Sequence, residues 1–214
     1  MIYSHLNNQY LLKQRMIGSG RWNGAYYYSK EIVENFIPNI ETDRNWITVN
    51  VKGMGADHSI VFIHNNNRPQ NYEWLSKYDD LVLICGVPST VEKVKHLGHA
   101  IYLPLSIDKE YVEQFKTKKT KETAYVGRKA KRMNIELGNV DFIENLPREK
   151  LLKEMAKYKN VYAVGRTALE AKVLGCNILS FDPRYPDVKL WKAYDNKTMI
   201  KRLQKELDDY DKKR

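Results

Sequence analysis

The chain has 214 residues, of which 43% are hydrophobic and 29% charged, and its formal net charge is +10. This length provides for one large domain or two small ones, and the apolar content excludes an intrinsically disordered chain. No stretch approaches the ~20 apolar residues of a membrane span and the N-terminal segment lacks the apolar core of a signal peptide, so we expect a cytoplasmic protein.

The positive charge is concentrated in the second half of the chain. Residues 1–107 carry ten Lys and Arg against nine Asp and Glu, whereas residues 108–214 carry 26 against 17. Such a half attracts nucleotide phosphates, nucleic acid or another acidic surface, and charge alone does not choose among them. Both cysteines, Cys85 and Cys176, lie in apolar runs. This placement favours buried free thiols in a reducing compartment.

In chain order, short apolar runs predict strands at 46–51, 59–64, 80–85 and 100–105. Pro88 or Ser89 can begin a helix between the last two of them, and Gly98 can end it. A strand, a helix and a strand at this spacing form the βαβ unit of a parallel sheet.

The segment 106–123 is polar and lysine-rich, which is typical of a hinge or linker. The alternation then resumes, with strands predicted at 123–127, 140–144, 161–165 and 177–181 and helices between the last three. A final amphipathic run at 188–207 precedes a charged tail that we expect to fray.

This pattern predicts an α/β protein of two Rossmann-like domains, an acceptor-side domain at 1–107 and a nucleotide-binding domain at 108–214. Their parallel sheets are expected to face each other across a cleft. In open α/β sheets, ligands bind beyond the carboxyl ends of the strands.

The stretch NVYAVGRTALEAKVLGCNILSFD, residues 160–182, joins a strand, a small-residue turn and a helix that carries Glu170 near its start. First-turn amides of a helix lack helical partners and favour anions, and a carboxylate there can accept two ribose hydroxyls. The alternative is that Glu170 forms a capping box with Thr167.

Residues 165–182 resemble a segment of the C-terminal domain of GT-B glycosyltransferases, in which a turn leads into a helix of the type "EA...G" and then a strand that ends in Asp. The resemblance implies that Glu170 binds the ribose of a nucleotide sugar. It also implies that Arg166 and Thr167 form the turn that faces the diphosphate.

A second segment, TAYVGRKAKRMN at 123–134, resembles the strand ending in Gly-Arg that opens the same domain of the family. It implies that Arg128, with Lys131 or Arg132, neutralises the leaving diphosphate, which is electrostatic catalysis without a metal. The alternative for Arg128 is a solvated basic turn. The helical segment before residue 160 occupies the family's position between these two motifs.

The first half offers a glycine-rich stretch with Gly18 and Gly20, which looks like the family's loop before the first helix, near the donor phosphates. A plain surface turn is the alternative. His64 follows the strand 59–64, and a histidine of this domain deprotonates the acceptor hydroxyl in inverting members of the family. The alternative is a structural histidine.

The resemblance implies a metal-independent glycosyltransferase that moves a sugar from a nucleoside-diphosphate donor to an acceptor hydroxyl, with nucleic acid as a conceivable acceptor. Retaining members carry a second acid eight positions before the glutamate, where this chain has Tyr162, so a retaining mechanism is not implied. The Asp-x-Asp pattern at Asp209 and Asp211 lies in the charged tail, so no metal and no cofactor is predicted.

Two other functions stay open. One is a protein of the same fold that binds nucleotide or DNA without turnover, and the other is a sugar-nucleotide epimerase. The lysines of the linker are either contacts to polymer phosphates or a solvated face, and they are Lys116, Lys118, Lys119 and Lys121.

Overall fold

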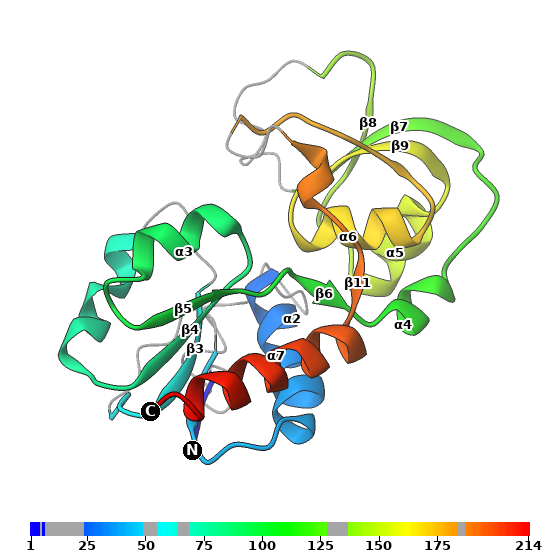
Figure 1. Ribbon diagram of the computed structural model, residues 1–214. Helices are drawn as coiled ribbons and strands as arrows, with labels where there is room; N and C mark the ends of the chain where they lie inside the picture. Colours follow the sequence, from blue (N-terminus) through cyan, green and yellow to red (C-terminus); the bar gives the residue numbers. More distant parts are fainter. Residues whose placement is uncertain (5, 7–23, 49–54, 64–68, 128–136, 184–186) are drawn as a thin grey trace. The chain divides into compact units, whose positions relative to one another are not determined.

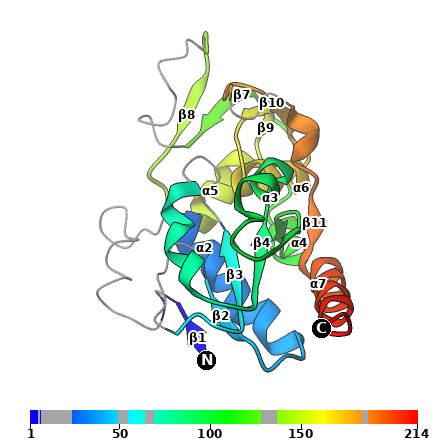
Figure 2. The ribbon, with the colours of Figure 1, turned by 60° about the vertical axis from the view of Figure 1, so that its left-hand side comes forward.

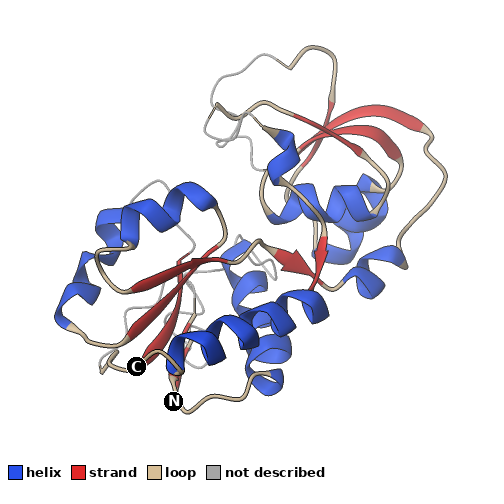
Figure 3. Ribbon diagram, in the orientation of Figure 1, coloured by secondary structure: helices blue, strands red, loops and turns tan. Residues whose placement is uncertain are grey.

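The computed structural model describes residues 1–4, 6, 24–48, 55–63, 69–127, 137–183 and 187–214 (Figure 1). These residues divide into two compact units. Unit 1 contains the described residues of 1–104 and the segment 197–214, and unit 2 contains those of 105–196. Each unit is an α/β layer structure around a parallel sheet, as the alternation of runs in the sequence predicts (Figure 3).

The sheet of unit 1 has five parallel strands in chain order. They are β1 (Ile2–Tyr3), β2 (Asn45–Ile47), β3 (Ser59–Ile63), β4 (Leu81–Cys85) and β5 (His99–Tyr102). Every residue of β3 and β4 is buried, because parallel sheets are covered on both faces and their strands are apolar without alternation.

Helical segments of unit 1 connect and cover these strands. They are α2 (Gly24–Glu31), which continues as η2 (Ile32–Phe36) and η3 (Ile37–Asn39), then η4 (Pro69–Lys77), α3 (Pro88–Val94) and α7 (Asn196–Asp211). Val61 and Leu83 pack with Leu75 and Val94 in one core cluster. Phe62, which points to the opposite face because strand side chains alternate, meets the ring of Phe36 at a centroid distance of 6.2 Å.

Unit 2 begins with β6 (Ser106–Ile107) and α4 (Lys109–Glu113). Its main sheet has four parallel strands in the order β10-β9-β7-β8. The remaining elements are β7 (Lys121–Val126), β8 (Asp141–Ile143), α5 (Arg148–Met155), β9 (Tyr158–Tyr162), α6 (Arg166–Val173), β10 (Asn177–Leu179), η6 (Val188–Leu190) and β11 (Tyr194–Asp195). Helices α5 and α6 pack on β9 (Figure 2), and their buried Leu152, Met155 and Leu169 join its Val161 in the core.

The predicted α/β class with parallel sheets is confirmed, and each run predicted as a strand overlaps a strand among its described residues. The segment 106–123 is more structured than a linker, because it holds β6 and α4 and reaches the start of β7. The last helix starts at Asn196 rather than Val188 and continues to Asp211. It belongs to unit 1, although the sequence boundary placed it with residues 108–214.

Cys85 and Cys176 are buried free thiols, as predicted. Burial raises the pKa of the Cys85 thiol to about 12. Within the described ranges, no helix has both the length and the apolar character that crossing a bilayer requires.

Candidate functional site

The two strands that carry the sequence motifs are neighbours in the sheet of unit 2. Strand β7 carries the apolar run of the segment 123–134, and β9 carries the start of the stretch 160–182. The two strands pair in parallel, and Tyr125 lies opposite Tyr162. The chain steps from β7 to β8 on one side and returns to the other side of β7 as β9. The order of strands therefore reverses at the β7–β9 pair, and in open α/β sheets the ligand crevice lies outside the carboxyl ends at this reversal.

The turn after β9 leads directly into α6. Gly165 precedes the helix with φ of +62°, a conformation that glycine adopts without the penalty paid by other residues. Its carbonyl accepts hydrogen bonds from the amides of Ala168, at 3.0 Å, and Leu169, at 3.2 Å. The amides of Arg166 and Thr167, at the first two helical positions, are donors without an acceptor inside the helix.

Glu170 lies in the middle of α6, is only 4% exposed and is held by two arginines. Its Oε1 accepts a hydrogen bond from Arg166 Nε at 2.9 Å and lies 2.9 Å from Arg148 Nη2. Both guanidinium side chains are themselves largely buried, with 13% and 14% exposed. The Arg148 guanidinium also lies 5.6 Å from the centre of the Tyr111 ring on α4.

Arg148 and Arg166 occupy equivalent positions, because each is the first residue of its helix. Helix N-termini carry about half a positive charge, so a cation there is unfavourable unless something compensates it. Here the Glu170 carboxylate contacts both guanidiniums, at the edge where β8 and β9 end. Guanidiniums and the first amides of a helix are groups that bind anions such as phosphate.

The capping-box alternative for Glu170 is wrong. Helix α6 begins at Arg166, one turn before Glu170, and has no side-chain hydrogen bond at its cap. The sequence analysis singled out Arg166, Thr167 and Glu170 but not Arg148, which contacts Glu170. A signal for Arg148 was present, because Pro147 can begin a helix and the preceding strand ends at the same edge of the sheet.

The other predicted site residues lie outside the described residues, and they are Gly18, Gly20, His64, Arg128, Lys131 and Arg132. Their predicted roles stay predictions. Strand β7, which precedes Arg128 in the segment 123–134, ends at Val126, at the edge of the sheet where β9 leads into α6.

Three of the four linker lysines contact other groups of the protein. Lys116 pairs with Glu113 at 2.9 Å and Lys121 with Glu154 at 2.8 Å. Hydrogen bonds to Glu154 and to Tyr158 raise the pKa of Lys121. Lys119 donates hydrogen bonds to the carbonyls of Ala156 and Leu174, both at 2.8 Å, and so caps the C-terminal ends of α5 and α6.

In the parts of the chain that the structure describes, no group of three or more His, Cys, Asp and Glu side chains is placed to hold a metal ion. Asp211 of the Asp-x-Asp pattern pairs with Arg44 at 2.6 Å. No protein-family model, curated protein or solved structure matches this chain at a significant level.

Proposed function

We propose that the protein is a glycosyltransferase of GT-B architecture that transfers a sugar from a nucleoside diphosphate to an acceptor hydroxyl. The observation that carries the proposal is the adjacency of β7 and β9 at the reversal of strand order, with the start of α6 beside them. Two motifs that resemble the donor site of this family, about 40 residues apart, thereby share one sheet edge.

In this proposal the donor diphosphate binds Arg148, Arg166 and the first amides of α6. Charge-assisted hydrogen bonds from two guanidiniums are strong and directional, and they stabilise the charge that develops on the leaving diphosphate. Arg128 and Lys131 or Arg132 would add to this charge. Glu170 holds the two guanidiniums, and the ribose contact that the resemblance implies is a further role for it.

The finer architecture is part of the proposal. Unit 1 would supply the acceptor side, with His64 as the base that deprotonates the acceptor hydroxyl and Gly18 and Gly20 near the donor phosphates. The two sheets would face each other across a cleft, as in the family. The excess of positive charge in residues 108–214 makes an acceptor on nucleic acid or another phosphate-rich polymer part of the same proposal.

The first test is a thermal-shift panel of UDP, GDP, TDP, ADP and CDP sugars, followed by assays of sugar transfer and donor hydrolysis. Binding of one nucleotide sugar with turnover supports the proposal. Stabilisation by none of the five overturns the donor site.

The matched variants are Arg148→Ala and Lys150→Ala, two cations of the first turn of α5, of which only Arg148 contacts Glu170. Loss of a charge-assisted hydrogen bond costs about 1.5–3 kcal/mol, so Arg148→Ala should weaken the binding of the nucleotide by roughly tenfold or more. Lys150→Ala should not. Because Arg148→Ala leaves Glu170 with one partner fewer, Arg148→Lys serves as a second variant that keeps the positive charge. If Arg148→Ala, Arg148→Lys and Lys150→Ala all bound the nucleotide with equal affinity, the assignment of Arg148 would be contradicted.

A non-catalytic nucleotide- or DNA-binding protein of the same fold is the second candidate, and the charge excess of residues 108–214 favours it. It predicts binding of duplex DNA that weakens steeply with salt, with a slope of about −0.9 for each phosphate neutralised. If the protein bound both DNA and a nucleotide but transferred no sugar, this second candidate would be favoured.

A further inference from the structure

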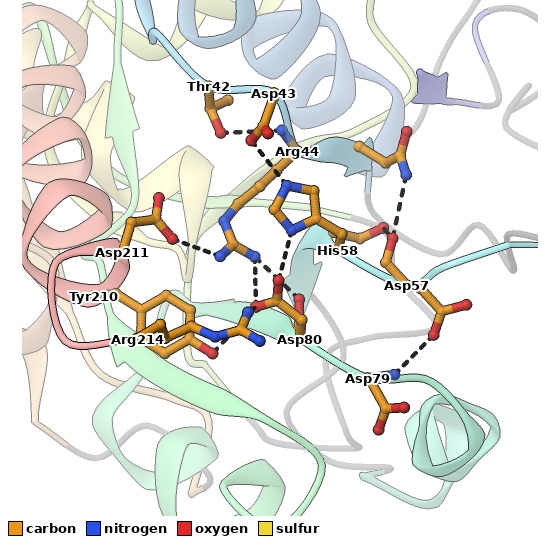
Figure 4. A network of polar contacts seen from close by, with 12 residues as sticks. Thr42, Asp43, Arg44, Asp57, His58, Asp79, Asp80, Tyr210, Asp211 and Arg214 are labelled. Carbon is orange, nitrogen blue, oxygen red and sulfur yellow. Dashed lines mark hydrogen bonds and ion pairs between the residues drawn. The ribbon is translucent and has the colours of Figure 1, made fainter.

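A second group of charged side chains lies in unit 1, at the amino ends of its strands. Arg44 precedes β2, His58 precedes β3 and Asp80 precedes β4. Ligands of a parallel sheet bind at its carboxyl edge, so this group has a task other than substrate binding there. We refer to it as the clamp (Figure 4), and its members are Asp43, Arg44, His58, Asp80, Tyr210, Asp211 and Arg214.

Arg44 joins the sheet edge to the last helix. It is 2% exposed, and its Nη1 donates to Asp80 Oδ1 at 2.9 Å while its Nη2 donates to Asp211 Oδ1 at 2.6 Å. Its guanidinium also lies 5.1 Å from the centre of the Tyr210 ring, a distance at which a cation is attracted to the ring face. Arg44 therefore attaches the last turn of α7 to unit 1.

Asp80 is the shared acceptor of the clamp. Besides Arg44, it meets Arg214 in an ion pair and accepts a hydrogen bond from the Tyr210 hydroxyl at 3.3 Å. Its Oδ2 lies 2.5 Å from Nδ1 of His58. The contacts of Tyr210 and Arg214 with Asp80 therefore depend on how the carboxylate is oriented, and His58 contributes to that orientation.

His58 faces a carboxylate at both ring nitrogens, because its Nε2 lies 2.8 Å from Asp43 Oδ1. A neutral imidazole has one N–H and can donate at one nitrogen only, whereas the protonated ring donates at both. With His58 protonated, three cations (Arg44, His58, Arg214) balance three carboxylates (Asp43, Asp80, Asp211). Loss of its proton leaves the clamp with one excess negative charge and one unmade hydrogen bond.

The backbone also shows that His58 and Asp80 are held in place. Both are non-glycine residues in the left-handed region, with φ of +52° and +55°. Such conformations cost on the order of 1–3 kcal/mol and persist where the surroundings enforce them. The contact between the two side chains therefore joins two strained turns of unit 1.

We propose that the clamp is a proton-dependent device that fixes the last turn of α7 to the sheet of unit 1 while His58 is protonated and loosens it when His58 loses its proton. The rest of the helix stays docked, because Met199, Leu203 and Leu207 are buried and Gln204 exchanges two hydrogen bonds with the backbone of Glu41. Only residues 208–214 respond.

The pH window follows from the signs of two shifts. Hydrogen bonds to Asp80 and Asp43 raise the pKa of His58 above its ordinary 6.5. The stability that protonated His58 gives to the folded clamp is therefore complete below about pH 6.5 and is lost as the pH rises through the raised pKa. Burial opposes, but hydrogen bonds from His58, Arg44 and Arg214 outweigh it and lower the pKa of Asp80 to about 2, so its contribution is lost only as acid approaches that value. The clamp is therefore firmest between about pH 4 and 6.5.

Other charged or titratable groups surround the clamp and share in its electrostatics. Asp57 accepts a hydrogen bond from the Asp79 amide at 2.8 Å beside His58. His99 of β5 stacks on Tyr210 at 4.4 Å, and burial lowers its pKa, so its shift is opposite in sign to that of His58. Glu206 and Lys213 of the C-terminal segment act on His99 through charge.

The test is amide hydrogen exchange of the full chain, followed by mass spectrometry between pH 5.5 and 8.5 and corrected for the intrinsic rate. Protection of peptides from 208–214 should fall about twofold to fivefold over this range, as expected for a partly exposed ion pair, while peptides from 199–206 stay constant. In His58→Asn, whose new residue tolerates a positive φ, protection of 208–214 should be low at every pH.

His96→Asn is the control, because His96 also pairs with a carboxylate, Glu73 at 3.3 Å, but lies outside the clamp. It should keep the wild-type response. If His58→Asn folds poorly, Asp43→Asn removes one partner of His58 without touching α7 and should move the midpoint to lower pH. A constant protection of 208–214 in the wild type, an unchanged response in His58→Asn or an unmoved midpoint in Asp43→Asn would overturn the proposal.

Discussion

At the scale of single residues, Glu170 combines burial with charge. A buried carboxylate is costly unless it is paired, and here two guanidiniums pair with one of its oxygens. The sequence showed an acid near the start of a helix but not its partner Arg148, which lies on another helix. The pairing indicates that the main role of Glu170 is to position the two arginines, and that contact with a ligand is a secondary role.

Glu170→Gln separates these roles, since glutamine keeps an oxygen that can accept hydrogen bonds but removes the charge. If Glu170 positions the arginines, we expect the affinity for inorganic pyrophosphate to hold or rise in Glu170→Gln and to fall in Glu170→Ala. If Glu170 binds ribose, Glu170→Gln should instead weaken nucleotide binding by about 1–3 kcal/mol and leave the affinity for pyrophosphate unchanged. Calorimetric titration measures both ligands, with the exposed Glu149→Gln of α5 as the control.

At the scale of elements, the sequence predicted those strands and helices that depend on a local pattern of apolar residues. The apolar runs of β3 and β4 and the amphipathic α5 are visible because their burial follows from their own residues. The start of α7 was not predictable, because residues 194–195 pair instead with β6, far away in the chain. Nor was the clamp, because it joins residues near 44, 58, 80 and 211 that only the fold brings together.

Lys119 is another contact between elements that the sequence left ambiguous. Its ammonium bonds the terminal carbonyls of α5 and α6 and lies 3.2 Å from Cys176 Sγ. Lys119→Met keeps the length of the stem but removes the donor, which leaves two partly buried carbonyls unsatisfied. We expect a loss of about 1–3 kcal/mol in the free energy of unfolding, measured by urea titration.

Its neighbour Lys118 is exposed and provides the control. Lys118→Met should change the stability by less than about 0.5 kcal/mol. Equal effects of the two substitutions would mean that Lys119 belongs to a solvated face, which was the other reading of the linker lysines.

At the scale of the whole molecule, unit 1 is discontinuous in sequence. The chain leaves it after Pro104, forms unit 2 and returns with α7, so unit 1 is complete only after unit 2 has been traversed. A boundary drawn from composition alone cannot detect this return, because α7 is an amphipathic helix like α5 of unit 2. The assignment of α7 has consequences for which core each apolar residue of the helix stabilises.

Two truncations of equal chemistry test this assignment. Leu203 of α7 and Leu152 of α5 are both fully buried, and either Leu→Ala change should cost about 2–5 kcal/mol. We expect Leu203→Ala to accelerate amide exchange in β3 and β4 of unit 1 and to leave β7 and β9 of unit 2 protected, and Leu152→Ala to do the reverse. If Leu203→Ala instead exposed β7 and β9, the helix would stabilise the residues that precede it in sequence, and the division of the chain into these two units would be wrong.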